Sequence, residues 1–209
     1  MAFLTPRSGT AIVLAVARPR NFEADAVVER AMQAFWTLGY ANASPAVLAE
    51  ATGVGKGSLY NAFGTKRELF ELALERYDRL GAQFAAELLA RPGTTEECLR
   101  AFLYDSVDSD LAQPIRRGCL AVNTAVELAG HDPQIARAVR RAVERTIDAL
   151  EARIAQGVRD GDLRAGLDPR ATAEYVMSTL VGLRVMARTY DAARLHRIID
   201  TALAVLDTA

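Results

Sequence analysis

The sequence predicts an all-α protein, and three observations lead to this prediction. Most of the chain carries apolar residues at helical spacing, with Ser, Thr or Asp as an N-cap before many segments and Gly or Pro after them. No segment has the apolar–polar alternation of a strand, and the chain contains no internal repeat. Two short helices around a glycine turn have the organisation of a helix-turn-helix. We therefore expect about nine helices, which form a three-helix head, a long connecting helix and a larger helical body.

Three short helices, each closed by a glycine, are expected in the head, at residues 23–38, 45–52 and 55–63. Gly39 and Gly64 end the first and the third helix. Gly53 ends the second, at a position where the backbone is expected to adopt the left-handed conformation. Ser44 is a good N-cap for the second helix, and Pro45 suits its first position because no hydrogen bond is lost there. Only a short turn then separates the second helix from the third.

The helices that follow are longer and begin at recognisable caps. Thr65 precedes the first of them, Thr94 and Glu97 form a capping box, and Asp-Pro pairs at Asp132 and Asp168 open two more. The expected limits are about 66–90, 94–111, 117–129, 132–159, 168–190 and 191–206. The first of these helices is long enough to join the head to the body.

The helix expected at 55–63 has one face for packing and another that is free for contact. With Leu59 toward the core, Ala62 and Phe63 lie on the same side. The other side carries small and polar residues, with a lysine at the positive end: Lys56, Gly57, Ser58 and Asn61, with Tyr60 at the flank. Such a face packs poorly but can closely approach base edges and phosphates. Periodicity alone leaves open the alternative of a solvated face on an ordinary helix hairpin.

The run from Phe22 to Leu74 resembles the DNA-binding domain of the TetR family of transcriptional regulators. The matching pieces are AFWTLGY at 34–40, Leu-Ala at 48–49, TGV at 52–54, KGSLYNAFG at 56–64, and Lys66 before an amphipathic helix. The resemblance covers about a quarter of the chain and is highly specific, because several pieces match in order and spacing. Two positions depart from the family pattern. Where this chain has Gly55, the family often has Ser. Where it has Ala62, the family often has a His that donates to a phosphate, so we do not expect a phosphate contact from position 62 here.

The resemblance implies a homodimer that binds a double-stranded, pseudo-palindromic DNA operator, and whose usual action is repression relieved by a small-molecule effector. We expect Lys56, Gly57, Ser58 and Asn61 at the major groove, and Ser44, Tyr60 and Lys66 at phosphates. Arg18 and Arg20 resemble the basic arm that precedes the first helix in many relatives. Such an arm can enter the minor groove, and a flexible solvated tail is the alternative.

Charge is balanced over the whole chain but not along it. The 25 basic and 26 acidic residues give a net charge of −1. Residues 1–22 and 53–67 each carry three basic and no acidic residues, whereas 16 basic and 18 acidic residues follow Leu80. Small basic patches on a neutral body can steer a protein to DNA. We expect a basic extension at 1–20, a helix-turn-helix DNA-binding domain at 21–79, and an effector-binding and dimerisation domain at 80–209.

The sequence gives little support for export, a membrane span or enzyme activity. The apolar run at 11–17 faintly imitates a secretory signal but is short, and no stretch is long enough to span a membrane. A cytoplasmic location is expected, which suits the free cysteines Cys98 and Cys119, although Cys119 could sense redox state. The cysteines lack metal-ligand spacing, and the only histidines, His131 and His196, lie near helix ends or on polar faces. We therefore expect no catalytic residue, no metal and no cofactor.

An effector pocket is expected in the body. Asn123 and Glu127 lie four residues apart on one face of an apolar helix, and a buried carboxylate needs a partner or a ligand. The candidate pocket residues are Tyr104, Asn123, Glu127, Met177 and Arg184. The alternative is structural, because Glu127 could pair with Arg116 or Arg184 and the apolar candidates could be ordinary core residues. The sequence does not identify the effector.

The last two helices carry more apolar surface than a single core can absorb, which indicates a dimer interface. The residues expected in it are Val176, Leu180, Leu183, Leu195, Ile199 and Leu203. The alternative is that both helices are buried within one subunit. The predicted function is therefore a ligand-responsive, DNA-binding transcriptional regulator. The competing prediction from another class is a helical ligand-binding or interaction protein whose head does not bind DNA.

Overall fold

The structure of the chain, a computed structural model, describes residues 20–206, and these residues contain helices but no strand. The all-α prediction is confirmed. The α-helices are α1 (Arg20–Asn42), α2 (Pro45–Thr52), α3 (Lys56–Phe63), α4 (Lys66–Leu89), α5 (Thr95–Leu111), α6 (Leu120–Thr124), α7 (Pro133–Asp160), α8 (Pro169–Met186) and α9 (Ala192–Leu203). A π-helical turn, η1 (Ala125–Ala129), follows α6, and a 3-10 turn, η2 (Ala204–Leu206), follows α9. None of the described helices combines the length and the hydropathy that a membrane crossing requires.

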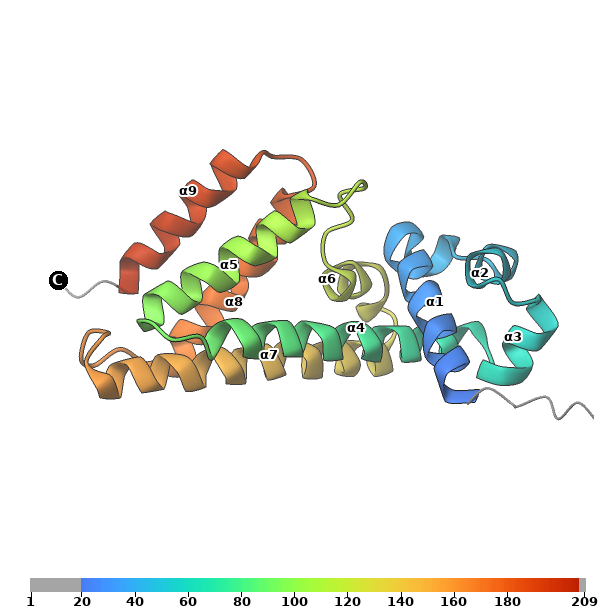
Figure 1. Cartoon of the computed structure of the whole chain (residues 1–209), viewed down its shortest axis with the longest axis horizontal. Coiled ribbons are helices and arrows are strands. Elements are labelled where there is room, and N and C mark those ends of the chain that lie inside the picture. The colour runs from blue at the N-terminus through green and yellow to red at the C-terminus, as the bar shows by residue number, and fades with distance from the viewer. Residues whose placement is uncertain (1–19, 207–209) are drawn as a thin grey trace, which may run out of the picture.

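The helices are distributed along an elongated molecule (Figure 1). The head, which consists of α1, α2, α3 and the start of α4, occupies one end, and α5, α8 and α9 lie toward the other. The long helices α4 and α7 contact each other and run through most of the length. The short α6 lies between the head and the rest of the body. A displacement inside the body can therefore reach the head through α4, α6 or α7.

The caps that the sequence predicts in the head are confirmed. The Ser44 hydroxyl accepts from the Val47 amide at 3.3 Å at the start of α2, and Gly53 ends α2 in the left-handed region at φ 69°. Gly39 interrupts α1 with φ 80° and ψ 167°, so the regular helix stops there as expected. The residues from Tyr40 to Asn42 form a separate helical turn, whose first amides need acceptors from outside that turn.

The caps of the longer helices are also as predicted. Thr65 and Glu68 form a capping box at the start of α4, and Thr94 and Glu97 form another at the start of α5. The side chains of three aspartates that precede α7, α8 and α9 accept backbone amides: Asp132, Asp168 and Asp191. These local hydrogen bonds explain why the starts of the helices can be read from the sequence.

Two helix limits in the body differ from the prediction. The helix expected at 117–129 begins only at Leu120 and becomes π-helical at Ala125. The reason for its late start is Gly118, whose φ of 65° cannot continue a right-handed helix. The helix expected to reach residue 190 ends at Met186, where the chain turns and the carbonyls of Ala187 and Tyr190 accept from Arg116 instead.

The buried apolar residues form two clusters. One lies in the body among α4, α5, α7, α8 and α9. The other fills the head around Phe35 and Phe70, whose rings meet edge to face with centroids 4.9 Å apart. Leu120, Ile135 and Val139, which come from α6 and α7, belong to the head cluster as well. The hydrophobic core of the head therefore continues into the body.

The predicted dimer-interface residues need correction. All six have 0–5% of their surface exposed within one subunit: Val176, Leu180, Leu183, Leu195, Ile199 and Leu203. They pack in the body cluster because α5 and α7 cover the apolar sides of α8 and α9. Side chains this buried have no surface left for a partner. The outer side of α8 and the turn after it instead expose Tyr175, Val185 and Tyr190.

Candidate nucleic-acid interface

Helix α3 is fixed to the head by one side and leaves the other side exposed. Leu59 is fully buried, and Val54 and Phe63 pack against the same cluster from the two ends of the helix. Lys56, Gly57, Ser58 and Asn61, which the sequence assigns to the DNA-contacting face, are all exposed. The structure thus brings these four residues together on one surface of a short helix.

Gly57 shows that this surface is not shaped by the protein's own packing. A Cβ added at Gly57 would meet no protein atom within 4 Å, so the fold does not require a glycine there. Glycine inside a helix nevertheless destabilises it by about 0.5–1 kcal/mol relative to alanine. Gly57 therefore leaves open space on the exposed face of α3 that the packing of the head does not require.

Tyr60 does not have the orientation expected of it. Its hydroxyl is buried and has no hydrogen-bond partner among the described residues. Burial, and then the nearby Tyr40, raise the pKa of Tyr60 above its usual value. A buried hydroxyl has little surface for a phosphate, so the phosphate contact predicted for Tyr60 gains no support from the structure.

Ser44 and Lys66 lie where the chain enters α2 and α4. The Ser44 hydroxyl accepts from Val47 and still has its own proton to donate. The Lys66 ammonium lies 4.4 Å from the centroid of the Tyr40 ring and donates to the Ala41 carbonyl at 3.4 Å. It stands at the positive end of α4, where an anion is favoured. Both positions remain compatible with phosphate contacts.

Most of the predicted minor-groove arm lies outside the residues that the structure describes. Arg18 lies outside the described residues. Arg20 is the first residue of α1. Their roles stay a prediction.

Several polar contacts, including the following three, connect the head to the segment between residues 117 and 132. In the first, the Trp36 indole donates to the Gly118 carbonyl at 2.7 Å, and the Arg117 guanidinium lies 4.0 Å from the centroid of the Trp36 ring. In the second, the Glu127 carboxylate accepts from the amides of Tyr40 at 2.9 Å and Ala41 at 2.7 Å. These are the free amides of the turn that follows Gly39. Glu127 therefore caps a helical turn of the head from within η1.

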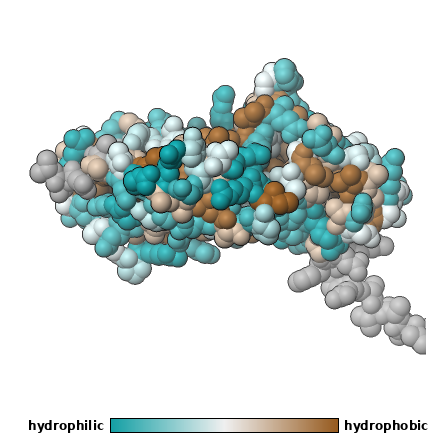
Figure 2. Space-filling view, turned by 90° about the horizontal axis from the view of Figure 1, so that it is seen from above, coloured by the Kyte–Doolittle hydropathy of each residue, from teal (hydrophilic) through white to brown (hydrophobic). Residues whose placement is uncertain are grey.

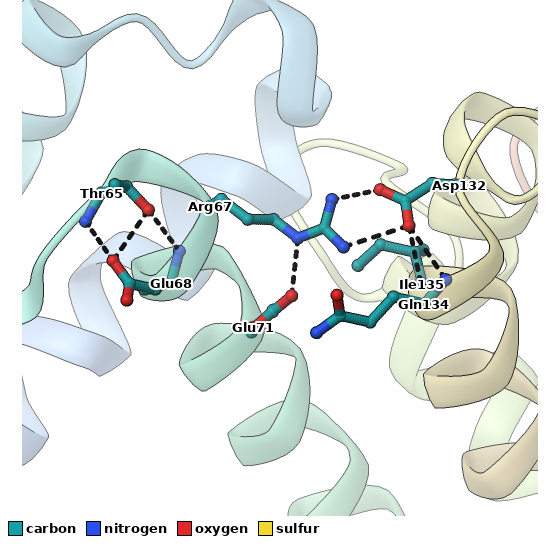
Figure 3. Close-up of polar contacts among 7 residues, drawn as sticks. All are labelled: Thr65, Arg67, Glu68, Glu71, Asp132, Gln134 and Ile135. Carbon is teal, nitrogen blue, oxygen red and sulfur yellow. Dashed lines mark hydrogen bonds and ion pairs between the residues drawn. The ribbon is translucent and has the colours of Figure 1, made fainter.

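The third contact joins the first turn of α4 to the start of α7 (Figure 3). Arg67 donates to both carboxylate oxygens of Asp132, with its Nη2 3.1 Å from Oδ1, and also to Glu71 at 2.6 Å. Asp132 accepts in addition from the amides of Gln134 and Ile135. The Arg67 guanidinium, helped by these amides, holds the pKa of Asp132 well below its usual range. Asp132 thus stays ionised while it caps α7 and holds the head.

The structure does not bring the five predicted pocket residues together. Met177 and Arg184 line a cavity inside the body, whereas Asn123 and Glu127 line a groove on the surface. Tyr104 lies in neither, since its hydroxyl donates to Asp200 at 2.8 Å and its ring stacks on His196. Glu127 also has neither of the arginine partners that the sequence suggested.

The cavity inside the body, which we call the interior cavity, has a volume of about 90 Å³, lies among α4, α5, α6, α7 and α8, and is partly open to solvent beside the exposed Gly81. Its lining is mostly apolar and includes Phe84, Phe102 and Met177. Its polar part includes Arg184, which makes a bidentate ion pair with the buried Asp110 at 2.8 and 2.7 Å. The cavity is smaller than the 300 Å³ or so of the smallest usual ligand pockets.

The described part of the chain has no candidate metal-binding site. No group of three or more His, Cys, Asp or Glu side chains could hold a metal ion there. The two cysteines are free, with Cys98 buried, and Cys119 accepts from the Tyr77 hydroxyl at 3.5 Å.

Comparisons with known proteins agree with the helix-turn-helix geometry. Residues 27–73 match the sequence model described as "Bacterial regulatory proteins, tetR family". Residues 95–203 match the model described as "Tetracyclin repressor-like, C-terminal domain". Together the two models cover the head and nearly all of the body.

Relatives and solved structures extend this similarity to as much as 91% of the chain. An uncharacterised HTH-type transcriptional regulator of Bacillus subtilis (strain 168), YezE, is 32% identical over 193 residues, which are 91% of this chain and 99% of the relative. The HTH-type transcriptional repressor ComR of Escherichia coli (strain K12) is 28% identical and covers 88% of each chain. A cysteine variant of the TetR family transcriptional regulator CifR, solved with 26-bp double-strand operator DNA, has a TM-score of 0.81 at 31% identity and covers 91% of this chain and all of that one.

Proposed function

This chain belongs to the TetR family of DNA-binding transcriptional regulators, and from this premise we propose that it is a homodimeric repressor that a small molecule releases from its operator. In this proposal residues 21–79 form the DNA-binding domain and residues 80–209 bind the effector and dimerise. The observation that carries the DNA-binding part is the exposed face of α3, where Gly57 leaves open space beside Ser58 and Asn61. An α-helix with such a face can enter the major groove and reach base edges.

Two substitutions in the head distinguish the recognition of specific bases from the affinity for DNA of any sequence. Asn61→Ala removes a side chain that can bond a base edge, so it is expected to relax base preference at one operator position by about 1–3 kcal/mol. Lys66→Ala removes a phosphate contact, so it should weaken all sequences alike and lower the salt slope by about one per site. Operator binding measured over a salt series, with base-substituted operators, checks both expectations. Arg164→Ala, an exposed arginine in the loop between α7 and α8, serves as the matched control.

The same experiment tests the competing function. A helical ligand-binding protein with an inactive head would show no preference for any operator sequence over unrelated DNA. Unchanged affinity and base preference in both variants would count against the assignment of the α3 face.

The proposed dimer interface is the outer face of α8 and α9, which differs from the buried residues predicted by the sequence. A hollow of about 560 Å³ lies there, and its lining includes Tyr175, Thr179, Gly182 and Met186. Gly182 lies inside α8, and a Cβ added to it would meet no protein atom within 4 Å. Its small size therefore does not serve the subunit's own packing and suits the close approach of a second α8.

Gly182→Arg is expected to convert the dimer to a monomer, because a guanidinium on this face would be placed between the two copies. Sedimentation velocity measures the change. Ala152→Arg, which places the same side chain on an exposed position of α7, should remain a dimer. A dimeric Gly182→Arg variant would rule out this face. Two-fold symmetry further predicts operator half-sites about one helical turn apart, or a multiple of it.

The interior cavity is small, so binding of an effector there would have to move the helices around it, and this supports control by an effector. A ligand that needs more than about 90 Å³ between these helices would push apart α4, α6 and α8, which supply Tyr77, Ala121 and Arg184 to the cavity wall. Cys119 directly precedes α6 and lies in the same segment as the contacts with Trp36 and Glu127. Widening the cavity would therefore shift the elements that hold the head. Couplings of this kind typically change the affinity for the second ligand by about 1–3 kcal/mol.

A further inference from the structure

A second hollow lies on the surface where the head meets the body. It has a volume of about 410 Å³, which falls within the 300–1,000 Å³ or so of typical ligand sites. Its walls come from the end of α1, the segment before α6, α6 with η1, and the end of α8. It shares no lining residue with the interior cavity. We call it the junction groove.

Large apolar side chains are unusually exposed in the junction groove. Val126 has 85% of its surface exposed, Ile115 has 59%, Val185 has 51% and Leu38 has 40%. On the face that Figure 2 shows, hydrophobic residues at the surface are mostly interspersed with hydrophilic ones. Single exposed apolar residues are ordinary, whereas four that line one hollow mark a binding surface.

Three arginines stand beside these apolar side chains, and their partners are neutral. Arg116 donates to backbone carbonyls after α8, Arg188 donates to the Asn123 side chain at 3.2 Å, and Arg117 donates to glutamine and threonine side chains. No carboxylate of the described residues pairs with any of these three guanidiniums. By contrast, seven other arginines pair with acids, among them Arg67 and Arg184. Burial lowers the pKa of Arg117, as expected for a cation that is partly desolvated without a counter-charge.

The groove also contains one carboxylate, but its charge is already engaged. Glu127 lines the groove and directs both oxygens at the amides of Tyr40 and Ala41. The net charge of the lining side chains remains positive, because three guanidiniums face this single acid. An uncharged apolar molecule would leave these cations without partners, and an anion without an apolar part would leave the exposed side chains uncovered.

We propose that the junction groove binds a small anionic amphipathic molecule, with its apolar part against Ile115, Val126 and Val185 and its acidic group among the arginines. Charge complementarity and the clustered apolar exposure together select this class of ligand. The proposal goes beyond the proposed function, because neither DNA contact nor the interior cavity requires it. A ligand there would lie against Trp36 and Glu127, so its binding is coupled to the position of the head.

A pair of dyes that differ in one acidic group tests the proposal. The probe is 1-anilinonaphthalene-8-sulfonate, and its uncharged counterpart is N-phenyl-1-naphthylamine. Fluorescence titration of the full chain, without DNA, should show one saturable site per subunit for the sulfonate and at least about tenfold weaker binding of the uncharged dye. The interior cavity shares no lining residue with the junction groove, so substitutions in the groove distinguish the two sites.

Two variants assign the site. Arg188→Met should weaken sulfonate binding about tenfold or more, as expected for loss of a charged hydrogen bond, and leave the uncharged dye unchanged. Val126→Asp, at a position with 85% exposure where folding is not at risk, should abolish binding of both dyes. The Arg164→Met variant, which changes an exposed arginine in the loop between α7 and α8 that does not line the groove, should bind both dyes like the parent chain.

Three results would overturn the proposal. The first is equal affinity for the two dyes, and the second is sulfonate binding that neither variant changes. In the third, Val126→Asp or Arg188→Met converts a dimer to a monomer in sedimentation, which would make the groove an interface between copies of the chain. Since the titration contains no DNA, its outcome is independent of whether the chain binds an operator.

Discussion

Asp110→Ala is expected to lower the free energy of unfolding by about 3 kcal/mol, the lower end of the range for breaking a buried ion pair. Asp110 has only 4% of its surface exposed and is the carboxylate that holds Arg184. Without it, the guanidinium would remain inside the body without an acidic partner. The lower end applies because 20% of the Arg184 side chain reaches solvent. Urea unfolding followed by circular dichroism measures the change.

The double variant Asp110→Leu/Arg184→Met distinguishes a lost charge partner from lost packing. Replacing both members of a buried ion pair by apolar residues of similar size is often neutral or stabilising. The double variant should therefore recover most of the stability that Asp110→Ala loses. If it is as unstable as the single variant, the ion pair is not what makes Asp110 important.

Glu127→Gln is expected to destabilise the chain by about 2 kcal/mol and to loosen the turn after Gly39. The carboxylate accepts two backbone amides, and hydrogen bonds to charged groups contribute about 1.5–3 kcal/mol each. A glutamine side chain offers only one oxygen, so one amide would face an NH₂ group instead. Hydrogen exchange should show faster exchange of the Tyr40 and Ala41 amides, and thermal unfolding should show a lower Tm.

A matched control for this variant is Glu50→Gln, which removes the same charge from an exposed position of α2. It should leave both the exchange rates and the Tm nearly unchanged. Normal protection of the Tyr40 and Ala41 amides in Glu127→Gln would contradict the role of Glu127 as the cap of this turn. A weakened effector response at normal stability would instead favour the ligand-binding role that the sequence suggested.

The helix boundaries were predictable because capping is local. The Thr65–Glu68 and Thr94–Glu97 boxes satisfy amides within three residues of the cap, so sequence spacing is enough to locate them. The exposed side of α3 was also predictable, since Leu59 alone sets the orientation of so short a helix. The change to π-helix at Ala125 was not, because nothing in the local sequence distinguishes it from an ordinary helix.

The remaining errors concern contacts between distant segments. The apolar stripes of α8 and α9 indicated burial correctly, but sequence cannot say whether α5 and α7 or a second copy of the chain covers them. Arg67 and Asp132 are 65 residues apart. From the sequence, Arg67 was recognisable only as a cation near a helix start, and Asp132 only as an N-cap. Glu127 was recognised as a carboxylate that needs a partner, yet backbone amides carry no sequence signal that would identify them.

The contact between Trp36 and Gly118 also gives this protein an optical reporter. Trp36 is the single tryptophan of the chain, and it is located at the junction of head and body. Its indole N–H is hydrogen-bonded across the junction, a cation lies over its ring, and Tyr77 meets it edge-on with centroids 4.9 Å apart. Its intrinsic emission wavelength therefore depends on whether these partners remain in place. Unlabelled protein can thus report opening of the junction in real time, because no second indole contributes to the signal.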